Sequence, residues 1–185
     1  MLTPIHVHGE RINEVEHNLV IPANYGCLAL LDSESYEGFV HEDWQLNQLK
    51  RHICSQAAKE RIVAWGCVSG NWRIRFTIGQ NPIAAVHEFS GVIRSSGNLL
   101  LTSYESLTMA AQFEDVKLPE PHEVSNLLEV PRGRFIVHVG QTFDHSQAEA
   151  EEVFEQASPH FIVSLLPGQQ TISTPATIPW FPDGG

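Results

Sequence analysis

Residues 71–78, NWRIRFTI, constrain the fold of this chain more than any other stretch. Large apolar residues alternate there with polar or charged ones; the apolar set is Trp72, Ile74, Phe76 and Ile78. Neighbouring side chains of a β-strand point to opposite faces, so this alternation predicts a strand with one buried face and one polar face. A glycine bounds the segment on each side, as is typical where a strand gives way to a turn.

Strand-like segments recur along most of the chain and are separated by Gly, Asn, Ser or Pro. They are NLVIPANYGCLALL at 18–31, RIVAWGCVS at 61–69, AAVHEFSGVI at 84–93, NLLLTSYESLTMAAQF at 98–113, GRFIVHVGQTF at 133–143 and HFIVSLL at 160–166. Thirteen glycines and eleven prolines supply the turns that such a chain needs. We therefore predict a mainly β fold, a β-sandwich of antiparallel strands.

Two segments have the pattern of short helices packed on the sandwich. In residues 39–60 one apolar face is formed by Leu46, Leu49, Ile53 and Ala57. We expect Asp43 or a neighbour to cap the first turn of this helix. Residues 144–157, DHSQAEAEEVFEQA, form the second, in which Ser146 and Glu149 fit a capping box.

The length of 185 residues suits one medium domain. We place a single β-sandwich domain at residues 1–167 and a proline-rich, extended or disordered tail at 168–185. Trp180 and Phe181 are the residues through which this tail could dock onto the domain. At the other end, IHVHGE at residues 5–10 has the alternation of a first sandwich strand that ends at Gly9.

The net charge of −11 argues against a nucleic-acid-binding protein, which needs a basic surface to neutralise phosphates. It is compatible with a basic protein partner and also with simple solubility. The charge is uneven, because no Lys or Arg follows Arg134 while six acidic residues do.

The three cysteines, Cys27, Cys54 and Cys67, have no CxxC spacing, so we expect reduced thiols rather than a zinc site or a disulfide framework. No secretory pattern is visible at the start of the sequence, and no apolar run approaches the length of a membrane span. A cytoplasmic protein that does not interact with membranes is expected.

His6 and His8 have the HxH spacing with which many metal sites begin. A cupin-type site needs a carboxylate about four or five places further on, but Glu10 is too close and Glu14 is one place too far. Two strand histidines without a metal are favoured, and we expect no cofactor. A metal-dependent enzyme or small-ligand binder using His6, His8 and either His87 or His138 stays the alternative.

The motifs of common enzyme classes are absent. There is no GxSxG for an activated serine, and neither GxGxxG nor GxxxxGK[ST] for nucleotide phosphates. The segment HED at residues 41–43 could pair a general base with a metal ligand, but its place before a helix favours capping. The sequence therefore favours a protein without catalytic activity.

Residues 127–167 resemble the C-terminal part of the competence protein ComJ family in their order of strand, Pro-x-Gly turn, strand, polar insert and strand. Upstream, VHEDWQLNQLK, VAWGCVSGNWRIRFTI and GVIRSSGNLLLTS are similar to that family in order, so the resemblance spans about residues 18–167. The acidic residues around the tryptophan are ordered differently, and the tail is extra. The resemblance implies a compact β-sandwich that inhibits a nuclease by binding it.

The interpretation that we favour is an acidic binding protein of the inhibitor or immunity type that docks a basic protein such as a nuclease or toxin. Aromatic anchors with complementary charge give strength and a fast association rate to such an interface. The candidate partner-binding residues are Glu42, Asp43, Trp44, Glu149, Glu151 and Glu152.

Overall fold

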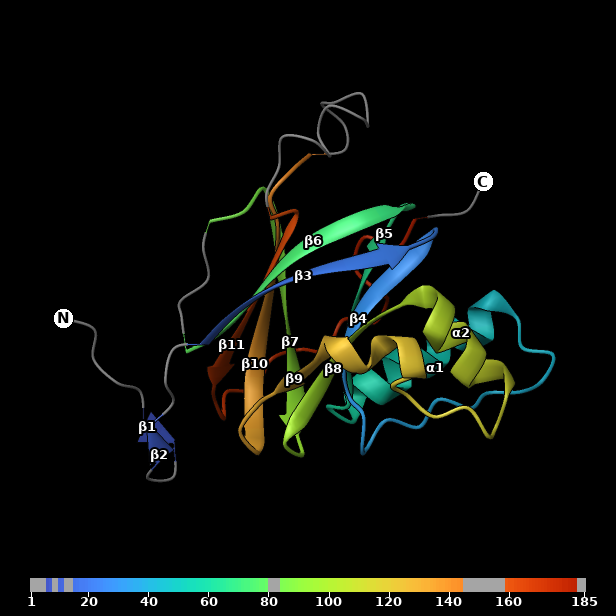
Figure 1. Ribbon diagram of the computed structural model, residues 1–185, viewed down its shortest axis with the longest axis horizontal. Helices are drawn as coiled ribbons and strands as arrows, with labels where there is room; N and C mark the ends of the chain where they lie inside the picture. The colour runs from blue at the N-terminus through green and yellow to red at the C-terminus, as the bar shows by residue number, and fades with distance from the viewer. Residues whose placement is uncertain (1–5, 8–9, 12–14, 80–83, 145–158, 183–185) are drawn as a thin grey trace.

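The computed structural model describes residues 6–7, 10–11, 15–79, 84–144 and 159–182. Two sheets dominate these residues (Figure 1). The first has the order β3-β6-β11-β10-β7, with bounds Val15–Ala23, Gly70–Ile78, Phe161–Pro167, Gly133–Gln141 and His87–Ser95. The second has the order β5-β4-β8-β9, with bounds Ile62–Cys67, Gly26–Asp32, Asn98–Ser103 and Leu127–Glu129.

All neighbouring strands in the two sheets are antiparallel except β6 and β11. The predicted mainly β, sandwich-type fold is confirmed. The expected first strand is different. Residues His6–Val7 (β1) pair with Glu10–Arg11 (β2) in a separate two-stranded sheet, so IHVHGE does not begin the sandwich.

The sandwich core lies between the two large sheets. The buried side chains of β6 lie in it, as their alternation predicts; they are Trp72, Ile74, Phe76 and Ile78. Trp65 of β5 belongs to the opposite sheet, and Phe161 of β11 lies beside β6 in the same sheet. On the opposite face of β6, Arg73 and Arg75 are partly exposed. Thr77 is an exception, since it is buried on that face and donates a hydrogen bond to Ser164 Oγ at 3.1 Å.

Two helices, α1 (Leu46–Ala58) and α2 (Tyr104–Gln112), form a third layer against the four-stranded sheet. Leu49 and Ile53 of α1 and Leu107 of α2 share an apolar cluster there with residues of β4, β5 and β8. We call this cluster the helix-side core; from the strands it includes Cys27, Ala29, Leu31, Ile62, Ala64 and Leu100. Because β4 is buried on both faces, its sequence is continuously apolar rather than alternating.

Helix α1 was predicted from its apolar spacing, although its cap is Gln45, whose backbone N–H donates to Gln48 Oε1 at 2.7 Å. The sequence pattern does not predict helix α2, because residues 98–113 have the pattern of a strand. They divide at Ser103 into β8 and α2, and a short 3₁₀ helix, η1 (Pro121–Asn126), follows. The helix predicted at 144–157 lies almost entirely outside the described residues.

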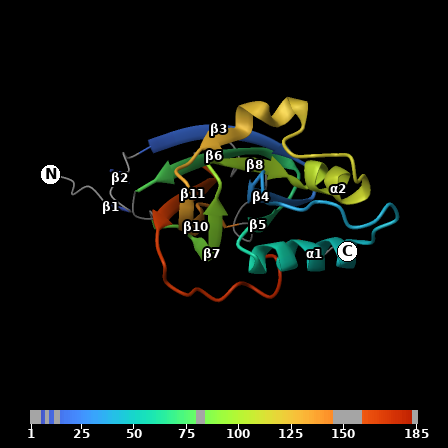
Figure 2. The ribbon, with the colours of Figure 1, turned by 90° about the horizontal axis from the view of Figure 1, so that it is seen from below.

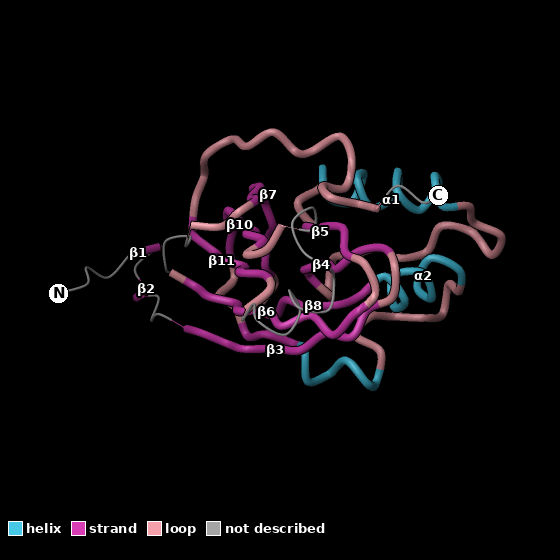
Figure 3. The backbone as a smooth tube through the Cα atoms, turned by 90° about the horizontal axis from the view of Figure 1, so that it is seen from above, coloured by secondary structure: helices cyan, strands magenta, loops and turns pink. Residues whose placement is uncertain are grey.

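The described part of the tail, residues 168–182, has no helix or strand and runs from the end of β11 to α1 (Figures 2 and 3). Gly66 N–H of edge strand β5 donates to Pro179 O at 2.7 Å. Trp180 contacts Phe89 of β7 and Phe161, with ring centroids at 5.2 and 6.4 Å. The tail therefore covers the open seam between β5 and β7. None of the described helices is long and apolar enough to cross a membrane.

Candidate protein-interaction site

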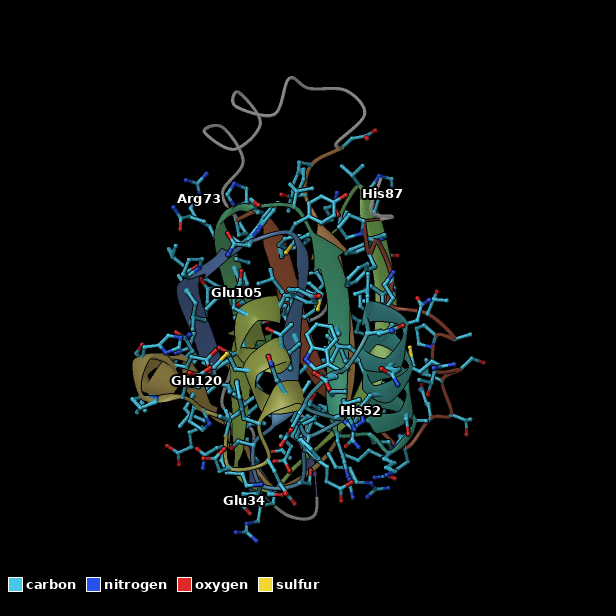
Figure 4. The ribbon with its side chains drawn as sticks, turned by 90° about the vertical axis from the view of Figure 1, so that its right-hand side faces the viewer. Glu34, His52, Arg73, His87, Glu105 and Glu120 are labelled. Carbon is cyan, nitrogen blue, oxygen red and sulfur yellow. The ribbon has the colours of Figure 1, made fainter. Side chains whose placement is uncertain are left out.

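The loop of residues 33–45 lies directly on α2. Val40 N–H and His41 N–H both donate to Ala111 O, at 2.9 and 3.1 Å. Gly38 approaches the helix so closely that a Cβ there would lie 2.8 Å from the Ala110 methyl group. The loop is also held from the other side, because His52 Nε2 of α1 lies 2.6 Å from Glu37 O; Figure 4 labels His52 on this helix. The position of the loop is therefore fixed by both helices.

A groove of about 420 Å³ opens between this loop and the residues that end α2. We call it the acidic–aromatic groove; its lining residues are Phe39, Glu42, Gln112, Phe113, Glu114 and Asp115. Phe39 is 40% exposed and Phe113 is 41% exposed, although large aromatic side chains are usually mostly buried. Such rings are the kind of side chain that anchors protein interfaces.

No cation of the described residues is paired with the carboxylates of the groove. Glu42, Glu114 and Asp115 are exposed, and no ion pair joins any of them to a Lys, Arg or His among the described residues. Lys117 is close, but its Nζ donates to the backbone carbonyl of Glu114 at 3.2 Å rather than to a carboxylate.

The backbone of α2 adds to this negative potential. The helix ends at Gln112 beside the groove, and its last turn has no basic residue. The C-terminal end of a helix carries a partial negative charge, so the helix dipole and the three carboxylates have the same sign. The groove is therefore a site at which a cation is favoured.

The structure places three of the candidate binding residues in or next to this groove. Glu42 lines it, and Asp43 is exposed on the same loop, with its N–H donating to His41 Nδ1 at 3.0 Å. Trp44 is half-buried and packs against the helix-side core, so only part of its ring faces solvent. Glu149, Glu151 and Glu152 lie outside the described residues.

Sequence reasoning missed Phe39, Phe113, Glu114 and Asp115. A signal was present, because an aromatic residue precedes a Glu-Asp pair in both segments, as FVHED at 39–43 and FED at 113–115. The second copy is hard to recognise, because Phe113 is the last residue of the strand-like segment 98–113 and Glu114 and Asp115 follow it.

The candidate metal residues are not brought together among the described side chains. His6 lies on β1 without a described side chain, and His8 lies outside the described residues. His138 Nδ1 is 2.7 Å from Ser90 Oγ on the neighbouring strand, and His87 is exposed at the start of β7. Within the described ranges no group of three or more His, Cys, Asp or Glu side chains could hold a metal ion.

The three cysteines are free thiols in the structure. Burial raises the pKa of the Cys67 thiol to about 12, and burial raises the pKa of the Cys27 thiol further still. Both therefore stay protonated at neutral pH, whereas the nucleophile in thiol chemistry is the thiolate. Their environment is that of structural thiols.

Comparison with known proteins shows likeness in fold. No protein-family model and no curated protein sequence matches the chain. A solved structure described as crocagin biosynthetic gene J is 16% identical, with a TM-score of 0.59 over 85% of this chain and 100% of that one. The crystal structure of ComJ from Bacillus subtilis, described as the inhibitor of the DNA-degrading activity of NucA, is 8% identical, with a TM-score of 0.50 over the same shares. The resemblance to ComJ expected from the sequence is thus shown at the level of the fold.

Proposed function

We propose that this chain is a non-enzymatic binding protein that docks a basic protein partner through the acidic–aromatic groove. The observation that carries the proposal is a set of three carboxylates, unpaired with any cation of the described residues, beside two partly exposed phenyl rings. Like charges held close together repel in the free protein. A Lys or Arg of a partner relieves that repulsion, while the rings supply apolar contact area.

Asp43, on the same loop as Glu42, widens the negative surface, and the partly exposed Trp44 adds apolar area. Glu149, Glu151 and Glu152 belong to the proposed surface as further acidic residues, on the strength of the sequence. The overall charge of −11 supports steering toward a basic protein, because long-range attraction raises the association rate.

The partner class that fits best is a nuclease. An enzyme that holds DNA needs basic residues to neutralise phosphates, and an acidic surface competes for the same residues. The fold neighbour ComJ is described as an inhibitor of a DNA-degrading activity, which supports this class by analogy of fold. The proposed action is occlusion of the partner's basic cleft.

The test is a side-by-side capture with two baits. One bait is the wild-type chain, and the other carries Glu42→Gln, Glu114→Gln and Asp115→Asn. We expect a basic protein that is retained by the first bait and lost from the second, and that loses DNA-cleaving activity when the purified wild-type chain is added. A captured partner that binds both baits equally would place the interface elsewhere, and unimpaired DNA cleavage in the complex would exclude inhibition.

A further inference from the structure

We propose that the acidic–aromatic groove receives an arginine side chain of the partner and discriminates against lysine. This inference rests on the proposed function, since it specifies which group of a basic partner enters the groove. It depends on the combination of ring surfaces and carboxylates, because carboxylates alone would attract any cation.

Two phenyl rings line the groove from opposite sides. Phe39 comes from the loop and Phe113 from the end of α2, so the groove has a phenyl side chain in each wall, and each is about two-fifths exposed. A guanidinium group is planar and weakly hydrated, and it stacks on an aromatic face while its edge stays free to donate hydrogen bonds. An ammonium group is compact and strongly hydrated, so it loses more hydration when it approaches the same ring.

The carboxylates of the groove supply its hydrogen-bond acceptors. Glu42 lies on the loop side of the groove, and Glu114 and Asp115 lie on the helix side. Their oxygens are acceptors that no described cation occupies. Arginine presents five donors in a fixed fork that matches a carboxylate in a two-point contact, and it can reach a second carboxylate with its remaining donors. Lysine offers a point charge without that geometry.

The loop that carries Phe39 and Glu42 is held in place in the free protein. Three contacts hold the loop before any partner binds. They are the two hydrogen bonds to Ala111 O, the close approach of Gly38 to Ala110, and the contact of His52 with Glu37 O. A site that is already formed does not lose loop entropy on binding. Stacking depends on ring placement, so a fixed loop is a condition for discrimination between two cations of equal charge.

The experiment uses the full chain labelled with ¹⁵N and two short peptides that differ only in carrying arginines or lysines at the same positions. At low salt we expect saturable shifts of the Phe113 and Glu114 amide signals with both peptides. The arginine peptide should bind about fivefold more tightly, the size of one cation–π contact. A peptide with glutamines at these positions is the control for charge.

Variants separate the contribution of the rings from that of the carboxylates. Phe39→Leu and Phe113→Leu should reduce the preference for arginine to less than about twofold, because they remove the π face and keep an apolar side chain. Glu42→Gln and Asp115→Asn should weaken the binding of both peptides, and that of the arginine peptide more, because an amide cannot accept the two-point contact of a guanidinium group. Val124→Ala and Glu129→Gln, which change an exposed valine and an exposed carboxylate outside the groove, should leave both affinities unchanged.

The two levels of the proposal fail differently. Equal affinity for the two peptides, or an arginine preference that survives both phenylalanine substitutions, would overturn the guanidinium inference and leave the docking of a basic partner standing. If neither peptide produces saturable shifts, both the guanidinium inference and the docking of a basic partner are overturned.

Discussion

At the scale of single residues, Gly66 decides whether the tail can cover the seam of the sandwich. A Cβ at this position would lie 1.9 Å from the carbonyl oxygen of Trp180, which is a steric overlap with backbone. The Gly66 N–H also donates a hydrogen bond to Pro179 O. The residue is glycine because another chain segment passes against it, which no local sequence pattern reveals.

We therefore expect Gly66→Ala to destabilise the protein by about 1–3 kcal/mol, as overpacking of a core does. The measurement is chemical denaturation followed by tryptophan fluorescence, in the full chain and in a chain that lacks residues 174–185. The loss of stability caused by Gly66→Ala should be much smaller in the shortened chain, because the backbone of Trp180 is no longer there to overlap with the new methyl group. An equal cost in both chains would show that the tail does not press on Gly66.

A second prediction at this scale concerns the alkaline limit of stability. Burial raises the pKa of Cys67 from 9.0 to about 12. Since the folded-state pKa lies above that of the unfolded chain, this contribution to stability is fully present below pH 9 and is lost as the pH rises toward 12. Each such thiol makes the free energy of unfolding fall by about 1.4 kcal/mol per pH unit in that window.

Cys67→Ala should therefore reduce the decline between about pH 9 and pH 11. It should also lower the stability at pH 7, because the buried sulfur atom leaves a gap in the core. Urea denaturation at a series of pH values measures both quantities. A decline as steep as that of the wild-type protein would mean that Cys67 ionises in the folded state as readily as in the unfolded chain.

At the scale of elements, α2 and the residues after it carry an electrostatic conflict. Glu114 and Asp115 follow the C-terminal end of a helix whose own dipole is negative there. Negative charges at this end are unfavourable by a few tenths of a kcal/mol at an exposed position, and they repel each other. In a binding groove these charges are useful, because a partner's cation offsets their unfavourable effect on stability.

Glu114→Gln should consequently raise the stability of the free protein by about 0.3 kcal/mol and weaken the binding of a basic partner. Thermal unfolding and a binding titration on the same preparation give the two readouts. Glu129→Gln, at an exposed strand position, is the matched control and should change neither. A loss of stability in Glu114→Gln would contradict the unfavourable charge arrangement described here.

The elements differ in how well the sequence predicts them. The alternation of β6 and the apolar spacing of α1 are enough, because each element has one fully buried apolar face and one more polar face. Helix α2 is not predicted because its buried face, Leu107, Ala110 and Ala111, follows the apolar β8 with no Gly or Pro between them. Local periodicity cannot divide such a run, since the boundary depends on the sheet that the helix packs on.

At the scale of the whole molecule, the groove results from packing between segments that are about 70 residues apart in the sequence. Glu42 and Asp43 could be singled out from the sequence because they adjoin a predicted helix. Glu114 and Asp115 could not, because their position depends on the loop of residues 33–45 lying against α2. The parallel pairing of β6 with β11 could not be predicted from the sequence either, since the two strands are far apart in it.

The measurement that tests the central claim most directly is the salt dependence of the dissociation constant for the captured basic partner. With the wild-type chain, we expect the dissociation constant to rise by at least about tenfold between roughly 50 and 300 mM salt, because screening shortens the reach of the groove's charges. The Glu42→Gln, Glu114→Gln, Asp115→Asn variant should bind more weakly at low salt and with a shallower slope. A dissociation constant that does not change with salt, or identical slopes for the two chains, would contradict the claim that these carboxylates dock the partner.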